Sequence, residues 1–418
     1  MNPLVVIPTF ITNSKRSSYS LRNIMTNYDY ESGLNDTLVL DRCLKSLQCV
    51  KDLGLVCVIV SADTAISAEA VEKVKRTCAN NPSIKTIVVG EVELDMLKKR
   101  AIQLGNSEII PKIGLRGYSA VRNTGLLLTQ AFGFNACVFL NDDEVVEDPD
   151  FLSKAMYGLG KLTRQGVPIL VKSGFYINES GSYLSSWKDA WYNKFWQQGA
   201  VFNEWISSAI AGSRLSRSSH VCGGCLAIHK EAFSRLSFDP YIPRGEDLDY
   251  MLNLRMYGSD IWFDNKWSLR RLAPKTKSEG NRFRQDIFRW LYEQAKIEYS
   301  WSLIDLQKIT AASLSPYPGI LLGKGLKTRI WLTAKLRSFG RPDKKAYSLA
   351  SKAAKKEALT YAYDNCTKYF DFQHLWPSLM KSIESDAVLS QAILKSAYDM
   401  PSVDITPGAT SEIQSNIS

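Results

Sequence analysis

Short apolar runs alternate with amphipathic segments along the first part of the chain. Residues 4–7, 55–60 and 85–89 are runs rich in β-branched side chains, and polar turns bound each of them. Such runs are typical of strands buried on both faces of a parallel sheet. Apolar positions at helical spacing separate them, with one helix expected over residues 67–78. This alternation predicts a doubly wound α/β sheet.

A polar stretch over residues 11–35 interrupts the alternation directly after the first strand. It is rich in Tyr, Asn and Ser and has no clear periodicity. A connection of this length is unusual and often functional. Two interpretations are open, a lid over a ligand site and a surface elaboration. Asp36 or Thr37 is expected to cap the helix that follows.

Polar side chains gather at the ends of the predicted strands. Pro8 and Thr9 follow the first strand, and Asp63 follows the second. Residues 141–144, which read Asn-Asp-Asp-Glu, follow a buried strand expected over residues 136–140. Ligands of doubly wound sheets bind outside the carboxyl ends of the strands. The sequence therefore predicts one shared site at this edge of the sheet.

The second half of the chain is mixed and then helical. Strands are expected at residues 169–172 and 226–228, and a helix at residues 246–257. Residues 187–205 hold many aromatic side chains, for which we favour a role in the core over stacking on a ligand. From residue 281 onward the pattern is helical.

Composition narrows the class of protein. A net charge of +10 and a pI near 9.0 suit an anionic partner such as a nucleotide diphosphate, a nucleic acid or an anionic membrane. No recognised nucleic-acid-binding motif occurs, so we expect no nucleic-acid partner. The chain enters its first strand without a signal peptide and has no apolar run of about 18 residues. These features predict a cytoplasmic protein without a transmembrane helix.

Five motifs, taken in order along the chain, resemble the GT-A-fold glycosyltransferases of family 2. They are residues 7–9 (Ile-Pro-Thr), 119–125 (Ser-Ala-Val-Arg-Asn-Thr-Gly), 141–144, 223–233 (beginning Gly-Gly-Cys-Leu) and 244–249 (Arg-Gly-Glu-Asp-Leu-Asp). The resemblance implies a Rossmann-like nucleotide-diphospho-sugar transferase fold. It also implies transfer of a sugar from a nucleotide-diphospho-sugar, with a UDP-sugar favoured, in the synthesis of surface glycans or polysaccharides. The acceptor would be a saccharide, a lipid-linked or a small hydroxyl compound.

The resemblance also suggests how the chain is divided. Residues 1–275 would form the GT-A domain, with a nucleotide-sugar-binding half (residues 1–150) and an acceptor half (residues 151–275). Residues 276–400 would form a helical C-terminal region. Residues 401–418 are polar and are expected to be a disordered tail.

The acidic motif is the candidate metal site. In the family, an Asp-x-Asp motif holds a divalent cation that bridges the donor diphosphate. The resemblance implies Mg²⁺ or Mn²⁺, which prefer oxygen ligands, with Asp143 and Glu144 as ligands and Asp142 beside the nucleotide sugar. Here Asn141 stands at the first acidic position, and residues 267–274 lack the histidine with which many relatives complete the metal site. Arginines in that stretch are candidates for neutralising the diphosphate directly.

Further donor contacts follow from the same resemblance. The nucleotide sugar would lie against Pro8, Thr9, Asp63, Arg122 and Asn123. Asp63 would bond a uracil imide, and an Asx turn or helix cap is its alternative role. Arg122 suits a diphosphate or a base because guanidinium groups bind such partners bidentately, and a structural salt bridge is its alternative role.

The catalytic candidates open the predicted helix at residues 246–257. A carboxylate at a helix N-terminus is favoured in its charged form and stays available as a base. The resemblance implies that Asp247 deprotonates the acceptor hydroxyl for in-line attack with inversion at the anomeric carbon, and that Glu246 supports it. Helix capping alone is the alternative. The acceptor and sugar pocket would comprise Gly223, Gly224, Arg244 and Trp187.

Two related reactions are the alternatives to an inverting transfer. Retaining GT-A enzymes of the mannosylglycerate synthase type, which make a small glycoside, also have helical C-terminal regions. A sugar-phosphate nucleotidyltransferase shares the α/β layout but needs a glycine-rich phosphate loop after its first strand. Residues 7–13 contain no glycine, which argues against it.

Two remaining patterns have a plain and a functional interpretation. Cys222 and Cys225 have metal or redox spacing, but we favour packing beside a glycine turn. Residues 324–356 hold eleven lysines and arginines against a single acidic residue, Asp343. A solvated helical face is the plainer interpretation of this stretch. The other is peripheral contact with an anionic membrane, which would place the protein on the inner face of that membrane.

Overall fold

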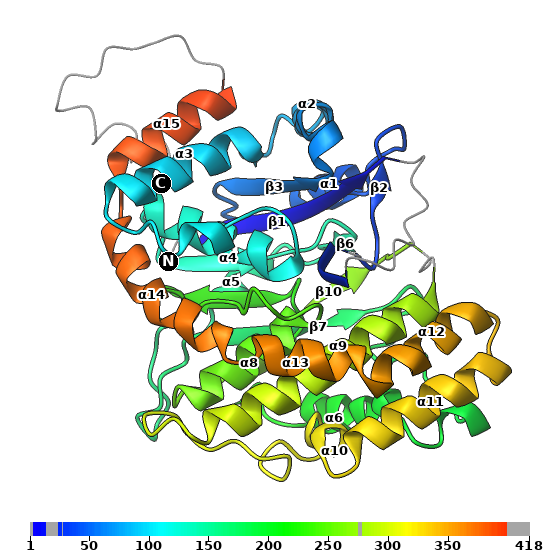
Figure 1. Ribbon diagram of the computed structural model, residues 1–418. Helices are drawn as coiled ribbons and strands as arrows, with labels where there is room; N and C mark the ends of the chain where they lie inside the picture. The colour runs from blue at the N-terminus through cyan, green and yellow to red at the C-terminus, as the bar shows by residue number, and fades with distance from the viewer. Residues whose placement is uncertain (1–2, 14–23, 27, 275–277, 399–418) are drawn as a thin grey trace.

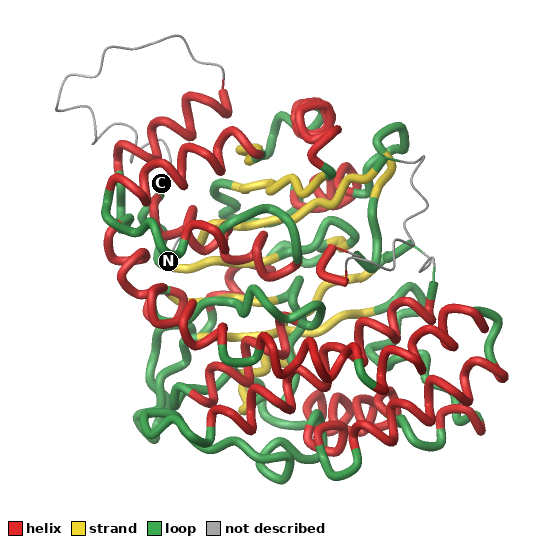
Figure 2. The backbone as a smooth tube through the Cα atoms, viewed as in Figure 1, coloured by secondary structure: helices red, strands yellow, loops and turns green. Residues whose placement is uncertain are grey.

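A sheet of ten strands runs through the computed structural model, which describes residues 3–13, 24–26, 28–274 and 278–398. Helices cover both faces of this sheet (Figure 1 and Figure 2). The strands are β1 (Pro3–Thr12), β2 (Ser32–Gly33), β3 (Val56–Ala62), β4 (Thr86–Val89), β5 (Ala136–Phe139), β6 (Glu144–Val145), β7 (Val171–Ile177), β8 (Leu215–Arg217), β9 (Leu226–His229) and β10 (Trp262–Arg271). Their order is β4-β3-β1-β5-β9-β7-β10-β6, with β2 beside β1 and β8 beside β10.

The first half of this sheet is parallel, as the sequence predicts. Strands β4, β3, β1 and β5 pair in parallel, and β9 then pairs antiparallel to both β5 and β7. Parallel pairing places the carboxyl ends of β1, β3 and β5 along one edge. The polar residues that follow these strands therefore lie at that edge.

Helices occupy the connections between strands and the whole C-terminal part. They are α1 (Leu40–Leu47), α2 (Ser67–Ala79), α3 (Glu91–Gln103), α4 (Tyr118–Ala131), α5 (Phe151–Met156), α6 (Gln198–Ala211), α7 (Lys230–Phe233), α8 (Glu246–Met256), α9 (Glu279–Ser300), α10 (Gly319–Leu322), α11 (Leu326–Gly340), α12 (Lys344–Lys355), α13 (Glu357–Asn365), α14 (Lys368–Ser382) and α15 (Ala387–Tyr398). The predicted α/β fold class and the helical C-terminal region are both confirmed. The predicted tail at residues 401–418 lies outside the described residues, and so do residues 14–23 and 27 of the polar stretch at residues 11–35.

Alternation along β1 divides the core between the two faces of the sheet. Val5 and Ile7 belong to the apolar cluster that includes α1, α2 and α5. Leu4 and Val6 belong to the cluster that includes α3, α4 and the C-terminal helices. Successive strand residues point to opposite faces, so one β-branched run supplies both layers.

One predicted helix start is wrong. Helix α1 begins at Leu40 after Val39, and no side chain caps it. Asp36 instead accepts a hydrogen bond from the backbone N–H of Gly33, at 3.0 Å. The turn that leads out of β2 therefore uses the carboxylate that the sequence pattern assigned to the helix.

The aromatic residues at 187–205 divide between the core and the surface. Trp196 and Trp205 are buried, which confirms the predicted core role for these two. Trp187 is half-buried and packs against Gly199 at the start of α6. Trp191 is 60% exposed.

The helices of the C-terminal part pack against both halves of the sheet domain. Helix α15 contacts α3, α4 and β4, and α12 and α13 contact α9. Figure 1 shows α11 and α12 side by side at the edge of the molecule opposite α15. None of the helices in the described part of the chain has both the length and the apolar character needed to cross a bilayer.

Candidate active site

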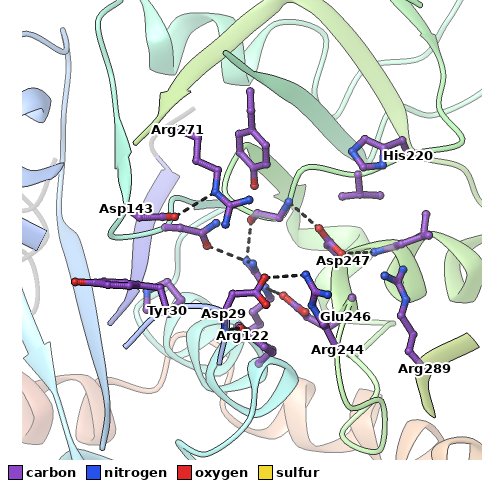
Figure 3. Close-up of a pocket in the computed structure, with 18 of the residues that line it drawn as sticks. Asp29, Tyr30, Arg122, Asp143, His220, Arg244, Glu246, Asp247, Arg271 and Arg289 are labelled. Atoms are coloured by element: carbon purple, nitrogen blue, oxygen red, sulfur yellow. Dashed lines mark hydrogen bonds and ion pairs between the residues drawn. The ribbon is translucent and has the colours of Figure 1, made fainter. Parts of the chain in front are cut away.

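A cavity of about 320 Å³ lies where the carboxyl ends of β1 and β5 meet the loop before β9 and the N-terminus of α8 (Figure 3). The predicted site residues that line it are Pro8, Arg122, Asp142, Asp143, Gly223, Arg244, Glu246 and Asp247. The predicted site residues outside its lining are Thr9, Asp63, Asn123, Glu144, Gly224 and Trp187. Motifs that are distant in the sequence thus contribute side chains to one cavity.

Arg122 links three walls of the cavity. Its guanidinium donates to Oε1 of Glu246 at 2.7 Å and to the carbonyl oxygen of Gly223 at 2.8 Å. A third donor lies 3.5 Å from Oδ1 of Asn141. The Arg122–Glu246 pair is almost fully buried. The salt bridge that was the structural alternative for Arg122 is therefore present.

Asp247 is held in place by two backbone groups. Its Oδ2 accepts from the N–H of Gly223 at 3.0 Å, and its Oδ1 accepts from the N–H of Leu248 at 2.8 Å. Gly245, just before α8, has a φ of +72°, and the guanidinium of Arg289 lies directly against it. A side chain at position 245 would collide with Arg289. This glycine lets a cationic group approach the turn that carries Asp247.

Asp142 and Asp143 both line the cavity and have different partners. Oδ2 of Asp142 accepts from the Thr9 hydroxyl at 2.7 Å, and Oδ2 of Asp143 lies 3.1 Å from Nε of Arg271. Burial, and then the charge of Asp143, raise the pKa of Asp142 to about 7. Arg271 also lies over the ring of Tyr176. The acidic pair therefore faces the cavity with one internal cation beside it.

Glu144 turns away from the cavity and closes the strand end. Its two carboxylate oxygens accept from the backbone N–H and the side-chain amide of Asn141, each at 2.8 Å. Burial, and then the charge of Asp143, raise the pKa of Glu144 to about 8. Gly224 packs directly on this carboxylate, where any Cβ would collide. Packing against Glu144 therefore explains why position 224 is a glycine.

Other predicted residues lie outside the cavity in defined roles. Asn123 is buried and bonds the backbone N–H and carbonyl of Phe238, each at 2.8 Å. Asp63 is half-buried at the end of β3 and does not cap the following turn η2 (Thr64–Ile66) through its side chain. The thiols of Cys222 and Cys225 are buried, as expected for packing, and burial raises the pKa of each.

The acidic pair meets the needs of a divalent cation that arrives with a diphosphate. Mg²⁺ is usually held by one or two carboxylates together with substrate phosphates and water. Asp142 and Asp143 supply such a pair, and a cation would offset both the burial and the charge of Asp143 that raise the pKa of Asp142. Within the described ranges, no group of three or more His, Cys, Asp or Glu side chains forms a complete protein site.

Asp142→Asn is expected to reduce the pH dependence of stability. A carboxyl group whose pKa rises on folding stabilises the folded state below its unfolded pKa and loses that contribution as pH rises through the folded value. Wild-type protein should therefore lose stability between about pH 4 and about pH 7, and the variant should lose less. Urea unfolding near pH 5 and near pH 8 measures the difference. Asp305→Asn, at an exposed position, is the control. If Asp142→Asn shows the same dependence of stability on pH as the wild type, the raised pKa of Asp142 in the folded state is contradicted.

Asp29 is a cavity residue that sequence reasoning missed. Its carboxylate accepts from Arg244 at 2.8 Å and lies 3.3 Å from Arg282. Although burial acts in the opposite direction, the charges of Arg244 and Arg282 lower the pKa of Asp29 to about 2. The sequence feature that could have indicated Asp29 as a site residue is the unusual polar stretch at residues 11–35, which contains it.

The opposite end of the cavity is aromatic and was also missed. His220, Phe202 and Tyr317 contact one another, with ring centroids 4.8 to 5.9 Å apart. Burial lowers the pKa of His220 to about 4, so the imidazole is neutral at pH 7. Its Nδ1 has no hydrogen-bond partner among the described residues. The cavity therefore has a charged end with Arg244, Arg271 and Arg282, and an aromatic end beside Asp247.

Comparison with protein-family models and with curated proteins gives no match. Among solved structures, the chain is similar to the mannosyltransferase PcManGT from Pyrobaculum calidifontis in complex with GDP-Man and Mn²⁺. The TM-score is 0.46 and the identity 14%, and the match covers 96% of this chain and 89% of that one. GalNAc-T7 with UDP, GalNAc and Mn²⁺ has a TM-score of 0.38 and 14% identity, over 88% of this chain and 58% of that one. A mycobacterial protein has a TM-score of 0.37 and 14% identity, over 70% of this chain and 74% of that one.

Proposed function

We propose that this protein is a glycosyltransferase that moves a sugar from a nucleotide-diphospho-sugar, with a UDP-sugar favoured, to a hydroxyl acceptor. The observation that supports it most is the placement of Asp247 and of the Asp142–Asp143 pair around one cavity at the carboxyl ends of the parallel strands (Figure 3). One carboxylate is positioned to act as a base. The other two suit a cation and a diphosphate.

The charged end of the cavity is the proposed donor half. Asp143, with Asp142 beside it, would hold Mg²⁺ or Mn²⁺, which neutralises the charge on the leaving diphosphate. Arg271 adds a fixed positive charge at the same place, 3.1 Å from Asp143. Pro8 lines this end, and Asp63 at the end of β3 remains the candidate for a contact with the base. Glu144 is left out of the metal set because Asn141 uses both of its oxygens.

The aromatic end is the proposed acceptor half. Asp247 faces it together with Arg289, His220 and Tyr317. Phe202 and Tyr317 offer apolar surface for a sugar ring, and the neutral His220 offers a hydrogen bond without a charge. A saccharide or another polyhydroxy acceptor suits this lining.

The reaction is a single displacement. Asp247 takes the proton from the acceptor hydroxyl as its oxygen attacks the anomeric carbon. The bond between that carbon and the diphosphate oxygen breaks, and the diphosphate leaves with the electron pair. Attack opposite the leaving group inverts the anomeric carbon. Gly223 and Leu248 keep the carboxylate oriented through their N–H groups.

The donor proposal is tested by thermal stabilisation with UDP, GDP, CDP and dTDP, each with and without Mn²⁺. A nucleotide at a hundredfold excess over its Kd stabilises the folded state by about 2.7 kcal/mol. We expect UDP with Mn²⁺ to raise the Tm most, and Asp143→Asn to remove the part that depends on Mn²⁺. If none of the four nucleotides raises the Tm of the wild-type protein, the donor site is refuted.

A further inference from the structure

Helices α11 and α12 carry a row of exposed lysines that the cavity does not use. On α11, Lys327, Trp331, Lys335 and Phe339 follow one another at intervals of four and share one side of the helix. The buried positions of α11, including Ile330 and Ala334, occupy the other side. Lys327 and Lys335 are exposed, and Phe339 is 68% exposed. This side of α11 therefore faces solvent.

Helix α12 extends the same surface. Its buried face is made of alanines and Tyr347, and its lysines lie on the opposite side. Nζ of Lys355 lies 5.5 Å from the ring centroid of Trp331, and Nζ of Lys335 lies 5.4 Å from it. Trp331 thus joins the two rows. We call this surface the lysine face; its exposed lysines are Lys324, Lys327, Lys335, Lys344, Lys345, Lys352, Lys355 and Lys356.

The lysine face lacks neutralising carboxylates. None of its lysines forms an ion pair with another residue in the described part of the chain. Asp343, the acidic residue within residues 324–356, turns toward α9 and accepts from the Ser278 hydroxyl and the N–H of Gly280. The positive charge of this surface is therefore free to meet an external partner.

Two of the three arginines of the same segment are bonded within the protein, and the third, Arg341, lies near the rings of Tyr192 and Tyr347. Arg329 donates to the carbonyl oxygens of Leu321 and Gly323, and Arg337 donates to Oδ1 of Asn193. Arginine is the side chain that binds nucleic-acid phosphates and bases bidentately. The exposed groups are instead lysines with aromatic rings at the rim. Trp191, 60% exposed, packs against Gly340 next to Phe339.

From this combination we infer that the lysine face docks on an anionic lipid bilayer, with the lysines at the headgroups and Phe339 and Trp191 in the interface. Clustered lysines are attracted to anionic lipid headgroups, and aromatic rings are favoured at the membrane interface. Helices α11 and α12 lie side by side at the edge of the molecule (Figure 1). This inference does not depend on the proposed glycosyl transfer.

Sedimentation with vesicles tests the inference. We expect the full chain to bind vesicles that contain phosphatidylglycerol, to ignore vesicles of pure phosphatidylcholine, and to release in high salt. Each lysine near an anionic surface strengthens binding about fivefold. The triple variant Lys335→Gln, Lys352→Gln and Lys355→Gln should therefore bind about a hundredfold more weakly. Phe339→Ser should weaken binding further.

The matched control removes the same charge elsewhere. Lys99→Gln, Lys161→Gln and Lys308→Gln are exposed positions outside the lysine face, and this triple variant should bind about as well as the wild type. Equal weakening by both triple variants overturns the inference, because binding would then follow net charge alone. It is also overturned by lysine-dependent binding to a random oligonucleotide without binding to vesicles, or by equal binding to both kinds of vesicle.

Discussion

Asp247→Asn is expected to lower the rate of sugar transfer about a thousandfold, which is the usual contribution of a general base. Asparagine has nearly the same shape but cannot accept the proton of the acceptor hydroxyl. Asp247 lies between the N–H groups of Gly223 and Leu248, so its carboxylate keeps one orientation toward the cavity. Initial rates with a donor and an acceptor at saturation measure the effect as kcat.

Two readouts separate a base from a structural cap in this variant. If Asp247 only stabilises the start of α8, the variant should lose stability and keep most of its kcat. If it is the base, the midpoint of unfolding and the nucleotide-induced rise in Tm should change little while kcat collapses. Asp305→Asn, which removes an exposed carboxylate, should leave both unchanged. Turnover at the wild-type rate from Asp247→Asn would remove Asp247 from the mechanism.

The sequence predicted the elements of the site better than the direction of its side chains. Apolar runs predicted the strands, and parallel pairing of β1 and β5 puts Asp142 and Asp143 at the sheet edge, where they line the same cavity as Asp247. Within the acidic motif, Asp142 and Asp143 line the cavity and Glu144 does not. Asp143 faces the cavity, whereas Glu144 pairs with Arg271 of β10 in the strand register and is bonded by Asn141. That register depends on a partner strand far along the chain, which a local pattern cannot supply.

The missed cavity residues have a similar physical cause. Arg282 and Arg289 belong to α9, which the sequence pattern assigned to a separate helical region after residue 275. The cavity uses residues on both sides of that predicted boundary. His220 and Tyr317 come from loops without periodicity, so nothing local marks their direction. Contacts between distant segments, such as those of His220 with Phe202 of α6 and with Tyr317, place them in the cavity with Asp247.

Lys296→Met is expected to destabilise the fold by about 3–5 kcal/mol, which is typical of removing one member of a buried ion pair. Lys296 is fully buried in α9 and forms ion pairs with Asp239, at 2.8 Å, and with Asp249 of α8. The Tyr292 hydroxyl also donates to Asp239, at 2.7 Å. Methionine fills a similar volume but leaves both carboxylates without a counter-charge. Lys308→Met, at an exposed position, should change stability by no more than about 0.5 kcal/mol.

The pH dependence of this loss identifies its cause. Burial raises the pKa of Asp249 to about 7, with Lys296 acting in the opposite direction. Removing Lys296 should raise that pKa further. Because a raised carboxyl pKa favours the folded state at low pH and disfavours it as pH rises, the stability gap between variant and wild type should widen from about pH 5 to about pH 8. Urea unfolding at the two pH values measures the gap. A gap that is the same at both would mean that lost packing, and not uncompensated charge, destabilises α9 and with it the cavity wall that Arg282 and Arg289 form.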